Sequence, residues 1–353
     1  MGGALKPVCG CGLVDVHTHF VPASFPAYAG RGSGTQWPSM APAQACHRHV
    51  MIDGKVYRTV SDQCWEPDVR RADMERTGVT RQVLSPMPEL LSYWLEPEDG
   101  ARLCRFLNET LAEFVAGDRG RFTGLGAVPL QDVDAAIREL DHAVHTLGLA
   151  GVEIGTNVNA TAIGDPKFDP FFAAAERWGA AIFVHALRPA GMDRLVGPPV
   201  LEQVVAFPGE VGLAAASMIT GGMIARHPRL RIAFSHGGGT LRAILPRLQH
   251  AWSGFDVIRK LVPEPPSDLA RRMYYDDLVY DNAAIGELIR VFGASQVMAG
   301  TDYPFAIMDP DPAGRLAVLA VDAATRQALC AGNAERWLGI DDSGAVSTAD
   351  HAR

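Results

Sequence analysis

The 353-residue sequence lacks several features that mark whole classes of protein. It has no uninterrupted run of 18 apolar residues, so a membrane-spanning helix is not expected. Residues 1–6 lack the apolar core of a secretory signal peptide, and we therefore expect a cytoplasmic protein. Basic residues form no stripe, and the formal net charge is −8. These absences argue against nucleic acid and anionic membranes as partners.

Cysteine is also sparse, and its spacing excludes two further kinds of site. The six cysteines are scattered along the chain. Cys9 and Cys11 are closer together than the cysteines of an ordinary zinc clip, and no second pair answers them. We therefore expect reduced thiols and no disulfide framework.

What the chain does contain is a regular alternation of short apolar strands and helices. Strands are predicted over 14–20, 79–85, 122–128, 151–155, 180–185, 230–236, 273–279 and 296–302. Helices are predicted over 67–77, 99–116, 132–147, 170–177, 211–225, 241–261, 285–292 and 323–338. Continuous apolar strands suit a parallel sheet buried on both faces, and eight such units predict an α/β fold, a (β/α)8 TIM-type barrel. An open doubly wound sheet is the alternative, but no glycine-rich phosphate turn follows the first strand.

We expect one domain over residues 1–341. A long insertion at about 21–67 interrupts the alternation and contains a hairpin signal, because Asp53-Gly54 separates two β-prone runs. The polar residues 342–353 are predicted to be a disordered tail.

Histidine and aspartate gather at the ends of the predicted strands, where the chemistry of a barrel takes place. His17 and His19 are two residues apart on a strand, so their side chains point the same way. His185, His236 and Asp302 end three other predicted strands. Three histidine nitrogens and one aspartate oxygen suit Zn²⁺ with a position left for water, although Mn²⁺ or Fe²⁺ would also fit. We predict His17, His19, His185 and Asp302 as the ligands.

His236 opens a run of three glycines and is predicted to act differently. A neutral imidazole beside a metal-bound water can take its proton, so we predict a general acid/base, against the alternative of a structural role. Glycines there would let the backbone approach a substrate closely. Asp302 is predicted as catalytic as well as ligating. His47 and His49 repeat the His-x-His spacing but lie in the insertion, and we expect them to be loop histidines.

Arginines complete the predicted site. Arg247 lies about three turns into the helix after the glycine run, and Arg58 lies in the hairpin near Lys55. Guanidinium groups suit carboxylate recognition, so we predict Arg58, Arg247 and Lys55 as substrate-binding residues. The alternative for each is an exposed surface charge.

Many motifs together resemble one known family. They are Val14-Asp15-Val16-His17-Thr18-His19-Phe20, Asp53-Gly54-Lys55-Val56-Tyr57-Arg58, Cys64-Trp65-Glu66-Pro67, Ser92-Tyr93-Trp94, Gly151-Val152-Glu153-Ile154-Gly155, Phe183-Val184-His185, Ser235-His236-Gly237-Gly238-Gly239, Gly300-Thr301-Asp302-Tyr303-Pro304-Phe305 and Ala331-Gly332-Asn333-Ala334. The sequence resembles the amidohydrolase-related metal-dependent decarboxylases, and the shared motifs run nearly end to end.

This resemblance implies a barrel with one divalent metal, usually zinc, and no organic cofactor. It implies that His236 activates the metal-bound water, and that the substrate carboxylate is held by Arg247 and by Arg58 from the neighbouring subunit of a homodimer. The expected reaction is non-oxidative loss of CO₂ from an unsaturated or aromatic carboxylate, with 2-amino-3-carboxymuconate 6-semialdehyde as the first substrate to test. Hydrolysis of a lactone or amide, or hydration of a double bond, is the alternative, and a binding protein without turnover is a third.

The chain departs from the family pattern after His185. The family typically continues there with Pro-Trp and a further tryptophan, whereas this chain has Ala186-Leu187-Arg188-Pro189. The family's aromatic wall is therefore expected to be missing, and Arg188 is predicted as a substrate-binding residue. The departure leaves the predicted metal ligands unchanged and puts the substrate in doubt.

Overall fold

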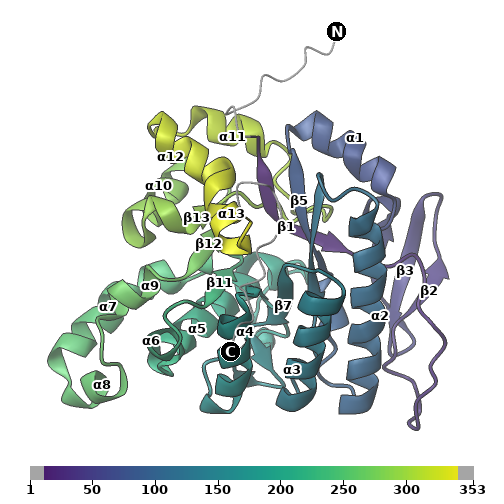
Figure 1. Cartoon of the computed structure of the whole chain (residues 1–353), viewed down its shortest axis with the longest axis horizontal. Helices are drawn as coiled ribbons and strands as arrows, with labels where there is room; N and C mark the ends of the chain where they lie inside the picture. The colour runs from purple at the N-terminus through teal and green to yellow at the C-terminus, as the bar shows by residue number, and fades with distance from the viewer. Residues whose placement is uncertain (1–11, 341–353) are drawn as a thin grey trace.

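The computed structural model describes residues 12–340, and its centre is a parallel β-barrel surrounded by helices (Figure 1). The eight strands follow one another around the sheet in chain order. They are β1 (Val14–Phe20), β5 (Arg81–Pro86), β6 (Phe122–Ala127), β7 (Gly151–Gly155), β10 (Ala181–His185), β11 (Arg231–Phe234), β12 (Tyr274–Asp276) and β13 (Val297–Met298). The predicted barrel is confirmed.

The barrel closes where the chain beyond β13 returns to β1. The backbone N–H of Val16 donates to the carbonyl of Ala299 at 2.9 Å, and that of Asp302 donates to the carbonyl of His17 at 2.8 Å. The N–H and hydroxyl of Thr301 also donate to the buried Asp15 carboxylate, at 3.1 and 2.6 Å. These bonds fix the loop that carries Asp302 against the strand that carries the two histidines.

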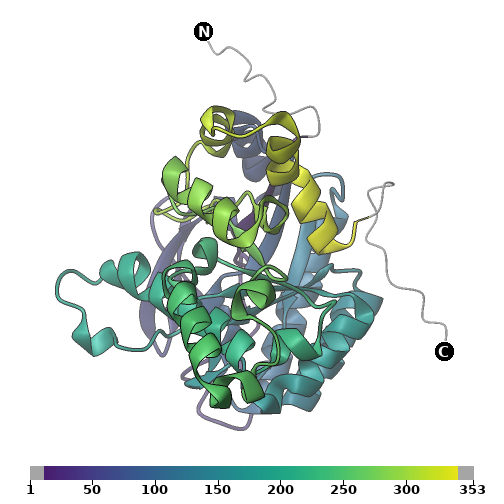
Figure 2. The ribbon, with the colours of Figure 1, turned by 90° about the vertical axis from the view of Figure 1, so that its left-hand side faces the viewer.

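Helices cover the outside of the barrel (Figures 1 and 2). They are α1 (Pro67–Thr77), α2 (Pro97–Ala116), α3 (Val133–Asp141), α4 (Asp169–Trp178), α5 (Phe207–Thr220), α6 (Met223–Arg226), α7 (Leu241–Gly254), α8 (Asp256–Leu261), α9 (Pro266–Ala270), α10 (Asn282–Phe292), α11 (Pro312–Val318), α12 (Ala323–Gln327) and α13 (Asn333–Leu338). The eight predicted helices are present. The predicted helix 241–261 is broken between α7 and α8, because Phe255 takes an extended backbone conformation.

Apolar side chains fill the barrel below the site, so its interior is a packed core. Val16, Phe183 and Met298 belong to this interior cluster, together with the fully buried Trp337 from α13. The rings of Phe183 and Trp337 are 6.0 Å apart. A floor of this kind leaves only the carboxyl ends of the strands free for chemistry.

The insertion after β1 forms a three-stranded antiparallel sheet of β2 (Ser39–Pro42), β3 (His47–Ile52) and β4 (Lys55–Ser61). The predicted hairpin turn is confirmed: Asp53 and Gly54 both have positive φ, 54° and 69°, which is the geometry of a two-residue hairpin. Val50 and Val60 are buried in the main core, so the hairpin is anchored to its own barrel. His47 and His49 lie on β3, and the expectation that they are loop histidines is therefore wrong.

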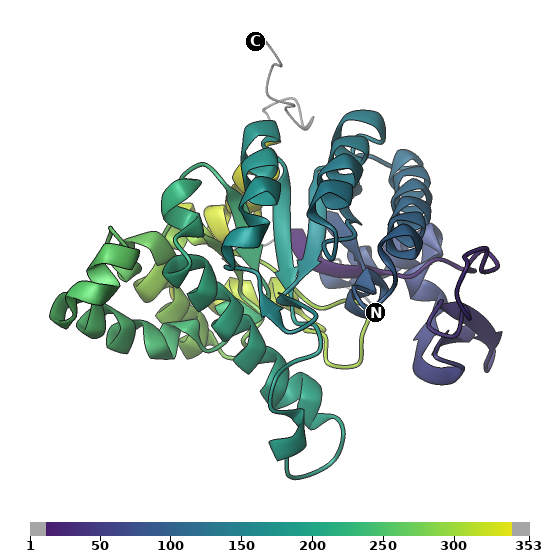
Figure 3. The same ribbon diagram turned by 90° about the horizontal axis from the view of Figure 1, so that it is seen from below.

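The segment after β10 projects away from the barrel (Figures 2 and 3). It contains short turns at Met192–Arg194 and Glu202–Ala206 and leads into α5. Residues Glu202–Thr220 are long and apolar enough to cross a membrane by composition alone. However, α5 packs its buried residues, Val211 and Met218 among them, into the protein core, as a core helix does.

Three predicted strands, 230–236, 273–279 and 296–302, end earlier than expected, and this matters for the site. β11 ends at Phe234 and β13 at Met298, before His236 and Asp302. His236 and Asp302 instead have left-handed backbone conformations, with φ of 54° and 65°. Such conformations are costly for residues with a side chain and concentrate at functional sites. The predicted disordered tail lies outside the described residues, as do Cys9 and Cys11; Cys46, Cys64 and Cys104 are free thiols.

Candidate metal centre and its cavities

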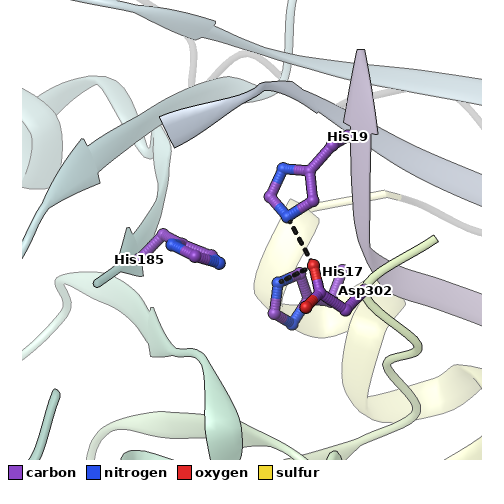
Figure 4. Close-up of side chains that lie close together, drawn as sticks. All are labelled: His17, His19, His185 and Asp302. Atoms are coloured by element: carbon purple, nitrogen blue, oxygen red, sulfur yellow. Dashed lines mark ion pairs between the residues drawn. The ribbon is translucent and has the colours of Figure 1, made fainter. Parts of the chain in front are cut away.

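Four predicted ligands from three parts of the barrel converge at its carboxyl end (Figure 4). Candidate ligand atoms of His17, His19, His185 and Asp302 all lie within 4.8 Å of one another, and all four residues are buried. Asp302 Oδ1 is 2.9 Å from His19 Nε2 and 3.6 Å from His17 Nε2. A cluster of three imidazoles and one carboxylate at this spacing is a divalent metal site.

Hydrogen bonds behind the cluster orient two of its imidazoles. His17 Nδ1 lies 2.7 Å from the buried carboxylate of Asp276, and His185 Nδ1 donates to the carbonyl of Ala186 at 2.9 Å. When Nδ1 carries the proton, Nε2 presents its lone pair, as metal binding requires. Asp276 was missed in the sequence because the predicted strand 273–279 hid the true strand end at this residue.

The buried polar atoms of the cluster fit a bound cation. In the described part of the chain, no hydrogen-bond partner is found for Nε2 of His17, Nε2 of His185 or Nδ1 of His19, and Nε2 of His19 and Oδ1 of Asp302 contact only members of the cluster. Burying so many unpaired polar atoms is costly, and a metal ion would satisfy them together.

The electrostatics of the cluster also suit metal binding. Burial lowers the pKa of His19 to about 4 and lowers that of His185 well below its usual value, so both imidazoles are neutral at pH 7. Burial opposes ionisation of Asp302, but His19 and His17 lower its pKa overall. Burial likewise opposes the charge of His17, yet the bond to Asp276 and the charge of Asp302 raise its pKa to about 9. A metal at Nε2 would take the place of that proton.

His236 lies beside the ligand group without belonging to it. Its ring centroid is 5.2 Å from that of His185 and 5.4 Å from that of His17. Burial and the charge of His17 lower its pKa, which favours a neutral imidazole. Its backbone N–H donates to Asp276 at 3.0 Å, and its Nδ1 lies 3.1 Å from the Ser235 hydroxyl, which leaves Nε2 for a substrate.

The glycines after His236 serve the protein's own packing more than was expected. A Cβ on Gly239 would lie 2.0 Å from the carbonyl oxygen of Pro208, and one on Gly238 would lie 2.6 Å from the Tyr275 ring. Both glycines have positive φ. Only Gly239 also lines a cavity, so the glycine run mainly permits a tight turn against α5 and β12.

Another buried carboxylate, that of Glu153 on β7, lies in the barrel interior near the cluster. The Ser85 hydroxyl donates to its Oε2, whereas Oε1 has no partner in the described part of the chain. Burial raises the pKa of Glu153 to about 8, although Ser85 and the charge of His17 oppose this. Glu153 is therefore mostly protonated at neutral pH.

Arg58 is placed over the site of its own chain, and this corrects an expectation. Its guanidinium carbon is 4.3 Å from the centre of the Phe305 ring, which in turn stacks on His19 at 4.9 Å. The expectation that Arg58 reaches a neighbouring subunit's site is wrong for this structure, because the anchored hairpin returns to its own barrel.

A narrow, charged cavity of about 20 Å³ lies on the Arg58 side of the metal cluster. Arg188 lines it, 3.3 Å above the Trp94 ring and with Nε 3.6 Å from Glu89 Oε1. Phe207 lines it too, with its ring 6.0 Å from that of His185. The expected lack of an aromatic wall is therefore wrong in part, because Tyr57, Phe207 and Phe305 supply rings from other segments.

A larger cavity of about 400 Å³ lies on the His236 side. It shares Phe207 and Asp302 with the narrow cavity, so the metal cluster stands between the two. The arginine that lines it is Arg242, in the first turn of α7, which was not among the predicted substrate-binding residues. Its position just after the glycine run was the available signal.

Two predicted substrate residues are not brought to the cluster. Lys55 is exposed at the end of the hairpin, and Arg247 is exposed on α7. Neither lines the narrow or the larger cavity of its own chain.

Comparison with known proteins agrees with this geometry. The amidohydrolase family model matches residues 14–340, nearly the whole described chain. This chain belongs to the amidohydrolase family. It is 36% identical over 332 residues to 2-amino-3-carboxymuconate-6-semialdehyde decarboxylase of Dictyostelium discoideum, covering 93% of this chain and 92% of that protein. The resemblance inferred from the motifs is confirmed.

Solved structures extend the likeness to the whole amidohydrolase barrel. The crystal structure of 5-carboxyvanillate decarboxylase from Sphingomonas paucimobilis is 25% identical, with a TM-score of 0.77, covering 94% of this chain and all of that one. The 5-carboxyvanillate decarboxylase of Novosphingobium aromaticivorans, solved with manganese, is 22% identical with a TM-score of 0.74, covering 93% and 96% of the two chains. The second likeness supports the fold alone.

Proposed function

We propose that this chain is a metal-dependent decarboxylase that releases CO₂ from an unsaturated or aromatic carboxylate without an organic cofactor. The observation that carries the proposal is the buried four-ligand cluster flanked by a neutral histidine, His236, and overlain by an arginine, Arg58. The family relationship supports the same reaction, because the Dictyostelium relative is a carboxy-lyase.

The chain's own residues divide the reaction between binding and proton transfer. When bound, the metal supplies a Lewis acid that polarises a substrate oxygen. Arg58 holds the reacting carboxylate by a charge-assisted hydrogen bond. His236, once protonated, delivers its proton to the carbon that bears this carboxylate. The bond to the carboxylate carbon then breaks, its electron pair restores the unsaturated system, and CO₂ leaves.

We propose zinc as the resident metal. Three imidazole nitrogens and one carboxylate oxygen suit Zn²⁺, whereas a relative has been solved with manganese. Loading metal-stripped protein with either ion and comparing turnover tests the choice. Higher turnover with Mn²⁺ at full occupancy would contradict zinc.

The decisive experiment combines the metal-loaded chain with 2-amino-3-carboxymuconate 6-semialdehyde, the proposed first substrate. We expect its absorbance to fall with release of one equivalent of CO₂. Loss of absorbance without CO₂ would instead indicate hydration or hydrolysis, the alternative reaction. If nothing reacts, hydroxylated benzoates are the next substrates, and the absence of CO₂ from all of them would overturn the proposal.

We also propose a homodimer in the cytoplasm, now with a different arginine shared between subunits. Arg58 serves its own site, and Arg247 is exposed and remote from its own cavities, so a carboxylate-binding Arg247 would have to act on a second copy. Mixing Arg247→Ala with Asp302→Ala protein should then restore some activity through hybrid dimers. No complementation despite demonstrated subunit exchange would contradict this arrangement.

A further inference from the structure

The larger cavity beside His236 has a mostly apolar lining with few charged side chains. Most of its wall is apolar, with Val204, Phe207, Pro208, Leu278, Val279 and Ile307 contributing. Arg242 is the one lysine or arginine in its lining, and Asp302, its one carboxylate, belongs to the metal ligands. A ligand that fills this cavity therefore meets one unneutralised cation at its wall.

Arg242 has no counter-ion of its own. Among residues 12–340, no carboxylate lies within ion-pair distance of its guanidinium, although the side chain is partly buried. Its charge is felt by Glu287, but that carboxylate is already held by Arg290 in two hydrogen bonds of 2.9 and 2.6 Å. A half-buried arginine without a counter-ion at the wall of an apolar cavity gains most from a carboxylate ligand, which accepts two of its hydrogen bonds.

The other arginines near the metal cluster are engaged differently. Arg188 is paired with Glu89 and stacked on Trp94 in the narrow cavity. Arg58 lies over Phe305 on that same side of Asp302. Among residues 12–340, Arg242 is therefore the one arginine that lines the cavity on the His236 side without a counter-ion.

We propose that Arg242 binds a second carboxylate of the substrate, so that the enzyme prefers dicarboxylates with an apolar, unsaturated body. This inference rests on the proposed decarboxylase function and names its substrate class. The reacting carboxylate lies at the metal cluster, the body fills the apolar cavity, and the retained carboxylate meets Arg242. The first turn of α7 adds the positive end of a helix dipole to the same wall.

The test measures equilibrium binding without turnover. Metal-loaded wild type and Arg242→Gln are titrated calorimetrically with benzoate and with benzene-1,3- and 1,4-dicarboxylate. We expect the wild type to bind at least one dicarboxylate more tightly than benzoate. Arg242→Gln should lower the affinity for that dicarboxylate about tenfold to a hundredfold, since a hydrogen bond between charged groups is lost. The affinity for benzoate should not change.

Two further variants serve as controls. Arg242→Lys keeps the charge and should recover part of the affinity, whereas Arg138→Gln removes an exposed arginine on α3 and should change nothing. Equal weakening of benzoate and dicarboxylates by Arg242→Gln would overturn the proposal. So would a wild type that binds no dicarboxylate more tightly than benzoate.

Turnover distinguishes failure of this inference from failure of the proposed function. With a dicarboxylate substrate, Arg242→Gln should raise KM about tenfold or more while kcat changes little. Arg242-dependent binding without CO₂ release from any carboxylate would remove the decarboxylase function and leave the subsite standing. CO₂ release with a KM that does not change in Arg242→Gln would support the decarboxylase function and remove the subsite.

Discussion

The metal ligands and the arginines around them come from different parts of the molecule. The ligands lie on or directly beyond barrel strands, are buried, and are oriented by groups such as Asp276 that are themselves fully buried. The arginines come from the hairpin, the projecting segment after β10 and the start of α7, and none of them is fully buried. From this contrast we expect the barrel strands to govern the reaction, and the hairpin, the projecting segment and the start of α7 to govern the choice of substrate.

The narrow and the larger cavity also differ from each other, in the charge of their linings. The narrow cavity is crowded with paired charges, including Arg188 with Glu89, whereas the larger one is apolar with a single unpaired cation. If the barrel governs chemistry, changes at its strand ends should abolish turnover or metal binding. Changes in the hairpin, in the segment after β10 or at the start of α7 should alter the affinity for particular substrates.

The largest effect is expected at His236. His236→Asn should lower kcat by about 10²- to 10⁴-fold, since it removes the proton donor and acceptor. Metal content, measured by elemental analysis, should stay at the wild-type value because His236 is outside the ligand group. His250→Asn, an exposed substitution on α7, is the matched control. Near-full activity of His236→Asn would show that another group moves the proton, and loss of metal would make His236 a ligand.

Asp276→Asn should weaken metal binding by about tenfold to a hundredfold, measured by competition with a chelator. An amide can donate toward His17 Nδ1, so the proton that the carboxylate holds there is no longer fixed and Nε2 ceases to be the favoured metal donor. Asp134→Asn on the exposed face of α3 should leave the affinity unchanged. An unaltered affinity in Asp276→Asn would mean that the ligands orient themselves without this support.

Glu153 gives a pH-dependent prediction for the barrel interior. Its folded pKa, about 8, exceeds the ordinary value of 4.5. Between these values the unfolded chain releases a proton that the folded chain keeps, so this group lowers stability as pH rises. Between pH 5 and pH 8 the free energy of unfolding of Glu153→Gln should therefore rise by at least about 1.4 kcal/mol relative to that of the wild type. Urea unfolding at both pH values measures the difference, and parallel profiles would show that Glu153 is ionised in the fold.

The smallest effect on the fold is expected at Arg188. Its exposed pairing with Glu89 and its stacking on Trp94 are together worth about 1 kcal/mol at most, so Arg188→Ala should barely shift Tm. Metal affinity should not change, whereas the ratio of kcat/KM between two substrates should. A substrate profile identical to wild type would remove Arg188 from the substrate-binding residues.

The barrel and its ligand set were predictable from the sequence because each rests on local patterns. Apolar strands of seven residues or fewer, the His17-Thr18-His19 alternation and the Asp53-Gly54 turn all encode their geometry within a few neighbours. The rule that chemistry lies at strand ends then selected the ligands from 11 histidines.

The remaining features depend on contacts that no short pattern records. Asp276 was hidden because the strand is three residues long, too short for its boundary to be read from apolar residues alone. Arg242 and Arg247 lie on one helix, and only the packing of α7 shows which of them lines the cavity. Phe207 comes from the far side of a projecting segment, so its place beside His185 is set by the tertiary fold.

One carboxylate joins two tasks that would otherwise vary separately. Asp276 accepts from the His17 imidazole through Oδ2, from the backbone of His236 through the same oxygen, and from Gly237 at 2.8 Å through Oδ1. The carboxylate that orients His17 for metal binding therefore also fixes the backbone of His236, the proposed proton donor. A substitution of Asp276 is therefore expected to disturb both positions at once, whereas a substitution of Arg58, Arg188 or Arg242 touches neither bond.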